Sequence, residues 1–287
     1  MLKVGLLALV TGLIAFPAAA QHTHQHGTMG EPQSEAIIAV SDAWMPADND
    51  EVVRPVYLTL HNLGESALRI VGIESPDAGV AQIQRLSENY GTVTARRVRS
   101  IEIPAGESLA LSAPDYQIGL SNLSRDLIEG DAITLRLMIA DGADEEKPLI
   151  VGVPVLNEAP PPSRLLVTDA WSRPADQGTV SAAYLLLTNP GETDVTIMSA
   201  AMALAGLVEI HEMVMQGDVM RMNPIPELIV PAGASAALEP GGNHIMLMDL
   251  QTALVEGGAL IVTLTFDDGS QQIVGVPVYN RMMMMME

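Results

Sequence analysis

Residues 57–64 read YLTLHNLG and residues 184–191 read YLLLTNPG, and these two stretches carry the clearest signal of the architecture. Each is a short run of residues that favour β-strands, and each ends in a turn signal with asparagine and glycine. The two lie 127 residues apart, and other matching segments keep this offset. The further pairs are SDAW 41–44 with TDAW 168–171, IPAG 103–106 with VPAG 230–233, and EG 129–130 with EG 256–257. One register held over this length indicates a tandem duplication, with a period too long for a solenoid repeat.

The duplication also predicts the domain boundaries. Near the carboxyl end the offset falls to 123, where GVPV 152–155 meets GVPV 275–278, and a longer charged hairpin tip at 141–148 explains the change. Residues 157–163, NEAPPPS, are rich in proline and predict a linker. We expect a signal peptide at 1–20, a His-rich tail at 21–35, a first domain at 36–156, the linker at 157–163, a second domain at 164–280 and a Met-rich tail at 281–287.

The local patterns predict an all-β fold. In the second repeat, short apolar or alternating runs are separated by turn signals such as PAG 231–233 and PGG 240–242. The expected strands cover residues 184–187, 210–214, 244–248 and 260–265. Many short strands joined by Gly and Pro turns are typical of an antiparallel sandwich or barrel. We therefore expect two tandem antiparallel β-sandwich domains.

The amino-terminal residues predict export. Lys3 precedes an apolar run at 4–16, and small residues follow as far as Ala20, which is the pattern of a secretory signal peptide. The run is too short for a spanning helix, which needs about 20 apolar residues. We expect a periplasmic, monomeric protein with no membrane span after cleavage of the signal peptide.

Composition excludes several classes of function. The chain has no cysteine, so it has no thiol nucleophile, no CxxC redox pair, no zinc–thiolate site and no blue-copper centre. Its formal net charge is −21, which argues against nucleic acid and anionic membranes as partners. No Ser/His/Asp set, catalytic carboxylate pair or phosphate loop stands out, so we do not expect an enzyme.

The second repeat carries a candidate metal site in His211, Met222, His244 and Met246. Side chains two residues apart on a strand share one face, so His244 and Met246 would point the same way. Thioether sulfur is a soft ligand that favours Cu(I), whereas Ca²⁺ and Mg²⁺ require oxygen ligands. The alternative is that these methionines only fill the core, as methionine commonly does.

The first repeat is an internal control for that alternative. At the matched positions it has Gln84, Ala95, Gln117 and Gly119, while neighbouring apolar positions keep their character. Core methionines should be matched by apolar residues of similar bulk. The joint loss of all four candidate ligands instead indicates a metal site that only the second repeat has kept.

Residues 164–280 resemble the periplasmic copper chaperone family called PCuAC, through its pattern His-(Met)-x10-Met-x21-His-x-Met. The resemblance implies a cupredoxin-like β-sandwich with an exposed Cu(I) site. It implies that His211, Met222, His244 and Met246 are the ligands and that Met213 holds the optional position. It also implies delivery of copper to the binuclear copper centre of cytochrome c oxidase, either directly to the oxidase subunit or through a thiol-containing assembly factor.

Three further features stay open at this point. The tail residues His22, His24 and His26 favour Cu(II) binding or form a solvated tail, and the run Met282–Met286 is a soft-metal tail or a bland one. The four arginines Arg85, Arg96, Arg97 and Arg99 are a docking surface or ordinary surface charge. If the two tails raise copper capacity, the rival function is copper sequestration for tolerance.

Overall fold

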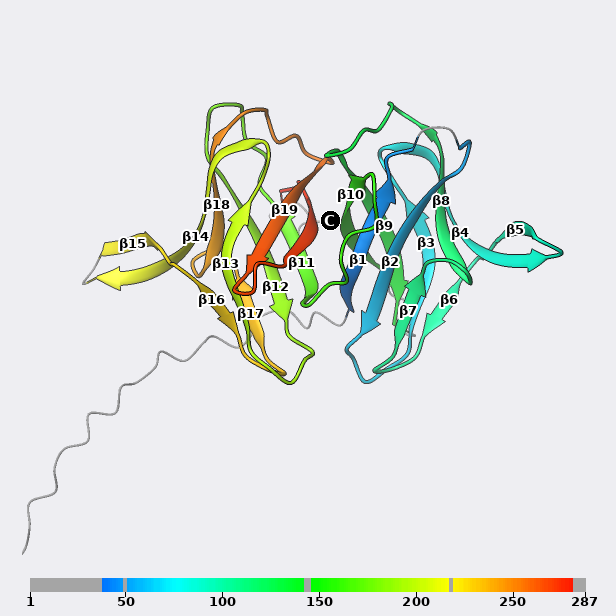
Figure 1. Cartoon of the computed structure of the whole chain (residues 1–287), viewed down its shortest axis with the longest axis horizontal. Helices are drawn as coiled ribbons and strands as arrows, with labels where there is room; N and C mark the ends of the chain where they lie inside the picture. Colours follow the sequence, from blue (N-terminus) through cyan, green and yellow to red (C-terminus); the bar gives the residue numbers. More distant parts are fainter. Residues whose placement is uncertain (1–37, 49–50, 142–145, 217–218, 281–287) are drawn as a thin grey trace, which may run out of the picture. The chain divides into compact units, whose positions relative to one another are not determined.

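The computed structural model describes residues 38–48, 51–141, 146–216 and 219–280. Within these ranges every regular element is a β-strand, so the all-β prediction is confirmed (Figure 1). No helix among the described residues could cross a membrane. The expected signal peptide, the His-rich tail and the Met-rich tail lie outside the described residues.

The first domain has two layers of strands. One layer runs from β1 through β2, then β7 and β8, to the β4–β5 hairpin, and the other runs in the order β6, β3, β9, β10. Its strands are β1 (Ile38–Pro46), β2 (Arg54–Asn62), β3 (Leu68–Glu74), β4 (Ala78–Asn89), β5 (Thr92–Arg97), β6 (Ile101–Ile103), β7 (Ser108–Leu111), β8 (Tyr116–Leu123), β9 (Ala132–Ala140) and β10 (Glu146–Leu156).

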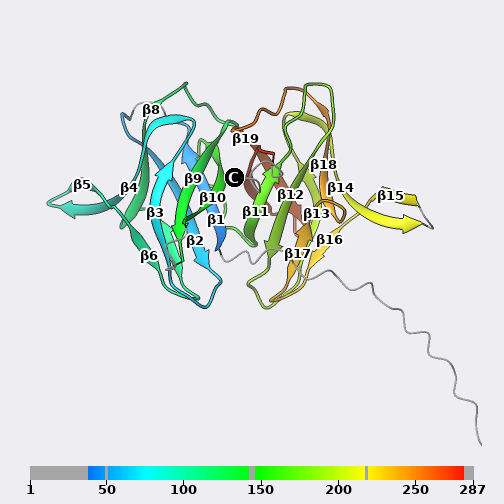
Figure 2. The same cartoon turned by 180° about the vertical axis from the view of Figure 1, so that it is seen from behind.

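The second domain repeats this arrangement strand for strand (Figure 2). Its layers run from β11 through β12, then β17 and β18, to the β14–β15 hairpin, and in the order β16, β13, β19, β20. Its strands are β11 (Leu166–Ser172), β12 (Ser181–Thr188), β13 (Val195–Ala201), β14 (Ala205–Gln216), β15 (Val219–Pro224), β16 (Leu228–Val230), β17 (Ser235–Leu238), β18 (His244–Leu250), β19 (Ala259–Phe266) and β20 (Gln271–Pro277). The predicted pair of antiparallel β-sandwiches is confirmed.

Each domain has its own hydrophobic core between its two layers. The strand β2 alternates buried and half-buried residues along its whole length, and Leu58 and Leu60 are among the buried ones. Leu185 and Leu187 occupy the matching buried positions in β12. Burying a leucine side chain stabilises a fold by about 1.5–3 kcal/mol, so these four leucines contribute directly to the two cores.

The backbone repeats one irregularity in both domains. Asp42 and Asp169 have positive φ angles of 54° and 50°, and each lies at a register shift between the first strand of its domain and the next strand. Aspartate tolerates this left-handed conformation better than most residues because its short side chain can hydrogen-bond locally. The shared bulge shows that the duplication extends to the local backbone conformation.

Equivalent strands of the two domains meet at a junction. β1 pairs with β11 at Val40 and Val167, and β10 pairs with β20 at Gly152 and Gly275. A Cβ atom at either glycine would collide with the backbone of the other, so the two strands can approach only because both residues lack a side chain.

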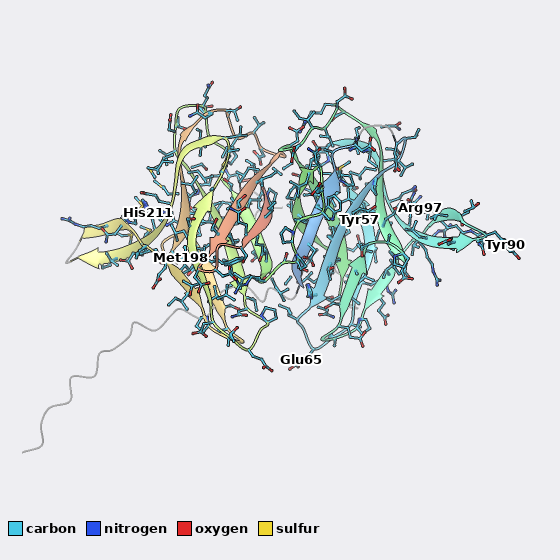
Figure 3. The ribbon with its side chains drawn as sticks, in the orientation of Figure 1. Tyr57, Glu65, Tyr90, Arg97, Met198 and His211 are labelled. Atoms are coloured by element: carbon cyan, nitrogen blue, oxygen red, sulfur yellow. The ribbon has the colours of Figure 1, made fainter. Side chains whose placement is uncertain are left out.

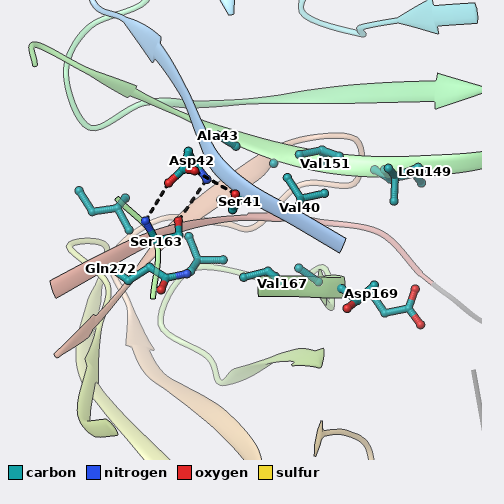
Figure 4. A pocket seen from close by; sticks show the side chains of 17 residues that line it. Val40, Ser41, Asp42, Ala43, Leu149, Val151, Ser163, Val167, Asp169 and Gln272 are labelled. Carbon is teal, nitrogen blue, oxygen red and sulfur yellow. Dashed lines mark hydrogen bonds between the residues drawn. The ribbon is translucent and has the colours of Figure 1, made fainter. Parts of the chain in front are cut away.

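Hydrogen bonds from the segment before β11 complete the junction. The Ser163 amide donates to the Asp42 carboxylate over 2.7 Å, and the Asp42 amide donates to the Ser163 hydroxyl over 3.1 Å (Figure 4). The end of the predicted linker is thus held against the first domain.

Candidate metal centre

The four predicted ligands lie on one face of the second domain, the face that points away from its core. In the β14–β18 pair His211 lies opposite His244, and in the β14–β15 hairpin Met213 lies opposite Met222. Met246 lies two residues after His244 and therefore shares its face. The alternate residues Ile210 and Ile245 point into the core. Strand alternation therefore brings the His and Met side chains together, as the sequence predicted.

The thioether groups and one imidazole line a common pocket on this face. Its lining includes Met213, Met222, His244, Met246, Tyr184 and Arg173. The His211 ring lies at the edge of this group, with its centroid 5.8 Å from that of His244 (Figure 3 labels His211 at the base of the hairpin). The structure thus gathers all four predicted ligands, together with Met213.

His244 is held in one orientation by a backbone carbonyl. The residue is 4% exposed, and its Nδ1 lies 3.1 Å from the carbonyl oxygen of Gly242. Because a carbonyl oxygen can only accept, Nδ1 carries the proton of the neutral ring. Nε2 then keeps its lone pair, which is the state that a metal ligand requires.

His211 is held in the complementary way by a carboxylate. Its Nε2 donates to Oε2 of Glu209 over 2.8 Å, and its Nδ1 is buried without a hydrogen-bond partner. Buried polar atoms nearly always have partners, so an orphaned nitrogen needs an explanation. A metal ion bound at Nδ1 would supply one. The chemistry of the two rings therefore fits a pair of metal ligands.

The thioether groups are accessible to solvent. Met222 is 52% exposed, while Met213 and Met246 are half-buried. Among the described residues no group of three or more His, Asp or Glu side chains could hold a metal ion. Two imidazoles with several thioethers form a soft, neutral donor set that suits Cu(I).

An aromatic group borders the pocket. The Tyr184 ring lies 6.3 Å from that of His244 and 4.6 Å from that of Trp171, and the guanidinium of Arg173 lies 5.3 Å over Tyr184. Burial raises the pKa of Tyr184, and the nearby charge of Arg173 lowers it by less. Tyr184 therefore lies beside His244 at the edge of the pocket.

The first domain has a pocket at the same place, and a hydrogen bond between two amides replaces the histidine pair in it. Gln84 and Gln117 lie opposite each other, as the two histidines do, and Nε2 of Gln117 donates to Oε1 of Gln84 over 2.8 Å. A Cβ atom at Gly119 would lie 2.8 Å from both Oε1 of Gln84 and Cγ1 of Val53. An amide pair therefore occupies the position of the histidine pair, and a methionine at 119 would require the side chains of Gln84 and Val53 to move.

The arginines of the first hairpin divide between two faces. Arg85 lies opposite Arg96, whereas Arg97 lies opposite Gln84. Since alternate residues face opposite sides, Arg97 shares the face of the amide pair, and Arg85 and Arg96 point to the other side. The sequence suggested that these arginines form one docking surface where the first domain lacks the metal ligands. Of these three residues, only Arg97 lies on that face.

Sequence reasoning missed the residues that orient the histidines, Glu209 and Gly242. The strand pattern contained a signal for Glu209, because it lies two residues before His211 and shares its face. Gly242 acts through its carbonyl oxygen, which no side-chain pattern can reveal.

One known protein family matches both halves of the chain. The sequence model of the family described as "Putative lipoprotein LpqE-like" matches residues 38–155 and again residues 165–278. Lxx21020 of Leifsonia xyli subsp. xyli, which carries the same lipoprotein description, is 36% identical over 113 residues, covering 39% of this chain and 68% of that protein. The two matches confirm the predicted duplication.

Solved structures of smaller proteins are also similar. "Copper-bound PCuAC domain from PmoF2" is 20% identical with a TM-score of 0.34, covering 40% of this chain and 92% of that one. "Solution structure of CuI-DR1885 from Deinococcus Radiodurans" is 29% identical with a TM-score of 0.33, covering 40% of this chain and 79% of that one.

Proposed function

The chain belongs to the LpqE-like family, with one copy of the family domain in each half, and from this premise we propose that it is an exported copper chaperone. Its second domain binds Cu(I) as cargo, and the first domain is a scaffold without a copper site. The ligands are Nδ1 of His211, Nε2 of His244 and the sulfur atoms of Met222 and Met246. The lipoprotein description of the family and of Lxx21020 supports an exported, periplasmic location.

One observation carries the proposal. Two buried imidazoles face each other across β14 and β18, and each has one nitrogen engaged by a protein acceptor. The other nitrogen of each ring keeps its lone pair, and exposed thioethers lie beside the rings. Outer-shell acceptors of this kind fix the tautomer and orientation of metal-bound histidines.

The same arrangement supports a mechanism of ligand exchange. Neutral thioethers bind Cu(I) without proton release, and an exposed Met222 can leave the metal without disturbing the core. A thiolate or imidazole of a recipient can then enter on the methionine side while the two histidines still hold the ion. Copper passes on without any change of oxidation state. The resemblance to PCuAC makes the binuclear centre of cytochrome c oxidase, or a thiol-containing assembly factor, the proposed recipient.

A competitive titration with a chromogenic Cu(I) chelator tests the site. The full chain should bind one tight equivalent, and His244→Ala/Met246→Ala should lose it. The matched control is Gln117→Ala in the first domain, which changes the equivalent strand and should leave the tight equivalent unchanged. Unchanged tight binding in the His244/Met246 variant would contradict the assignment of the ligands.

Copper sequestration remains the second candidate because of the two tails, His22–His26 and Met282–Met286. Sequestration predicts several equivalents of similar affinity, most of which survive the loss of His244 and Met246. Transfer of a single equivalent to a purified copper-free oxidase domain would favour the chaperone.

A further inference from the structure

Two methionines beyond the proposed ligands continue the site along the hairpin. Met215 lies opposite Met220, one rung further from the sandwich than the pair of Met213 and Met222. Alternate residues of a strand share a face, so both methionine pairs lie on the face of His211. The hairpin therefore carries a ladder of thioethers that leads from solvent to the histidine pair.

The spacing of this ladder suits a metal that moves by ligand exchange. Directly opposed side chains on an antiparallel pair have Cβ atoms about 4.5–5.5 Å apart, close enough for two thioethers to hold one ion. Successive rungs on one face are about 7 Å apart along the strand. A flexible methionine side chain can reach across much of such a step.

Core packing does not account for the outer pair. Met215 is 64% exposed and Met220 is 55% exposed, and neither belongs to the hydrophobic core of the second domain. In the first hairpin, the matched residues are Glu88 and Val93, which lie opposite each other in the same register. Methionines at these two positions therefore occur in the domain that carries the histidines and not in the other domain.

We propose that Met215 and Met220 form a second, weaker Cu(I) site through which copper enters and leaves the histidine site. This proposal rests on the proposed function and deepens it. An incoming ion binds the two exposed sulfur atoms first, exchanges to Met213 and Met222, and then reaches the imidazole nitrogens. No bond other than metal–ligand bonds forms or breaks, and Cu(I) keeps its oxidation state throughout.

The test compares rates with equilibria in the full chain. In Met215→Leu/Met220→Leu, which preserves apolar bulk, Cu(I) transfer from a chelator complex should slow about tenfold. The equilibrium affinity of the tight site should stay within about threefold of wild type, because the ligands themselves are intact. The matched control is Met198→Leu, an exposed methionine on β13 in the other layer, which should change neither quantity (Figure 3).

A second measurement separates this proposal from the function on which it rests. Ag(I), a redox-inert stand-in for Cu(I), is titrated into full chain carrying methyl-labelled methionine and the substitutions His211→Ala/His244→Ala. The Met215 and Met220 methyl resonances should still shift, which shows binding independent of the histidines. An unchanged transfer rate in the double leucine variant, or unshifted methyl resonances in the histidine variant, would overturn the entry site. If the wild-type chain binds no tight equivalent of Cu(I), the copper function itself is refuted. That outcome is read only from the wild-type titration.

Discussion

Removing the carboxylate of Glu209 should weaken Cu(I) binding even though Glu209 is not a ligand. Its Oε2 accepts the Nε2 proton of His211 over 2.8 Å and so keeps the lone pair on the buried Nδ1. In Glu209→Ala this acceptor is lost and the ring is free to take the other tautomer or to rotate. The metal must then reorganise the ring before it binds.

The expected loss of Cu(I) affinity depends on how exposed the side chains of Glu209 and His211 are. A hydrogen bond to a charged group contributes about 1.5–3 kcal/mol, which corresponds to about 10- to 100-fold in affinity. The Glu209 side chain is 36% exposed and that of His211 is 11% exposed, so water can replace part of the lost bond. We therefore expect the lower end, about tenfold weaker binding. Glu209→Gln keeps a neutral acceptor and should lose about threefold, since neutral hydrogen bonds are roughly half as strong.

Chelator competition measures the effect, and the same strand provides the control. Glu212 lies on the opposite face of β14, so Glu212→Gln makes the same charge change without touching His211. Its affinity for Cu(I) should match that of wild type. If Glu209→Ala binds Cu(I) within about twofold of wild type while His211→Ala loses the tight equivalent, then the carboxylate does not orient the ring and the reasoning fails.

Three predictions concern the scaffold. Gly275→Ala should lower the free energy of unfolding by about 1–3 kcal/mol in urea titration, because its Cβ would meet backbone at the junction. Gly72→Ala, whose Cβ would meet only a flexible methionine side chain, should cost less, and equal losses would argue against the close approach. Gln117→Ala should destabilise the first domain by about 1–3 kcal/mol, since it leaves the buried amide oxygen of Gln84 without its partner, and an unchanged unfolding midpoint would refute this role. Burial lowers the pKa of His61 more than the charge of Asp42 raises it, so the unfolded chain takes up the proton first. Stability should therefore fall as the pH drops below about 6.5, and a urea-midpoint profile should flatten in His61→Gln.

Much of the fold could be predicted because its signals are local and occur twice. YLTLHNLG and YLLLTNPG are short runs of strand-forming residues that end in turn signals, and such runs predict sandwich strands. Because the chain is duplicated, the strand and turn signals of one half could be checked against those of the other half. The junction between the domains could not be predicted, because Gly152 and Gly275 look like ordinary strand residues until their partner strands are known.

The candidate metal site, too, could be predicted only in part. The spacing of His244 and Met246 on one strand implies a shared face, which the structure bears out. The pairing of His211 with His244 depends on the register between β14 and β18, which no local pattern encodes. The choice of Nδ1 in one ring and Nε2 in the other depends on two acceptors that are visible only in three dimensions.

The hydrogen bond between Gln84 and Gln117 bears on how well the copper-free protein resists proteolysis. It links β4 to β8 within the first domain without any metal, at the place where the second domain has its two histidines. Through the strand pairs at the junction, the first domain also contacts β11 and β20 of the second. Proteases attack chains where segments open locally. Cleavage of the empty protein should therefore begin at the β14–β15 hairpin, far along the chain from the paired strands, and copper should suppress it. The strand pairs with the first domain should thereby confine early cleavage of the second domain to that hairpin.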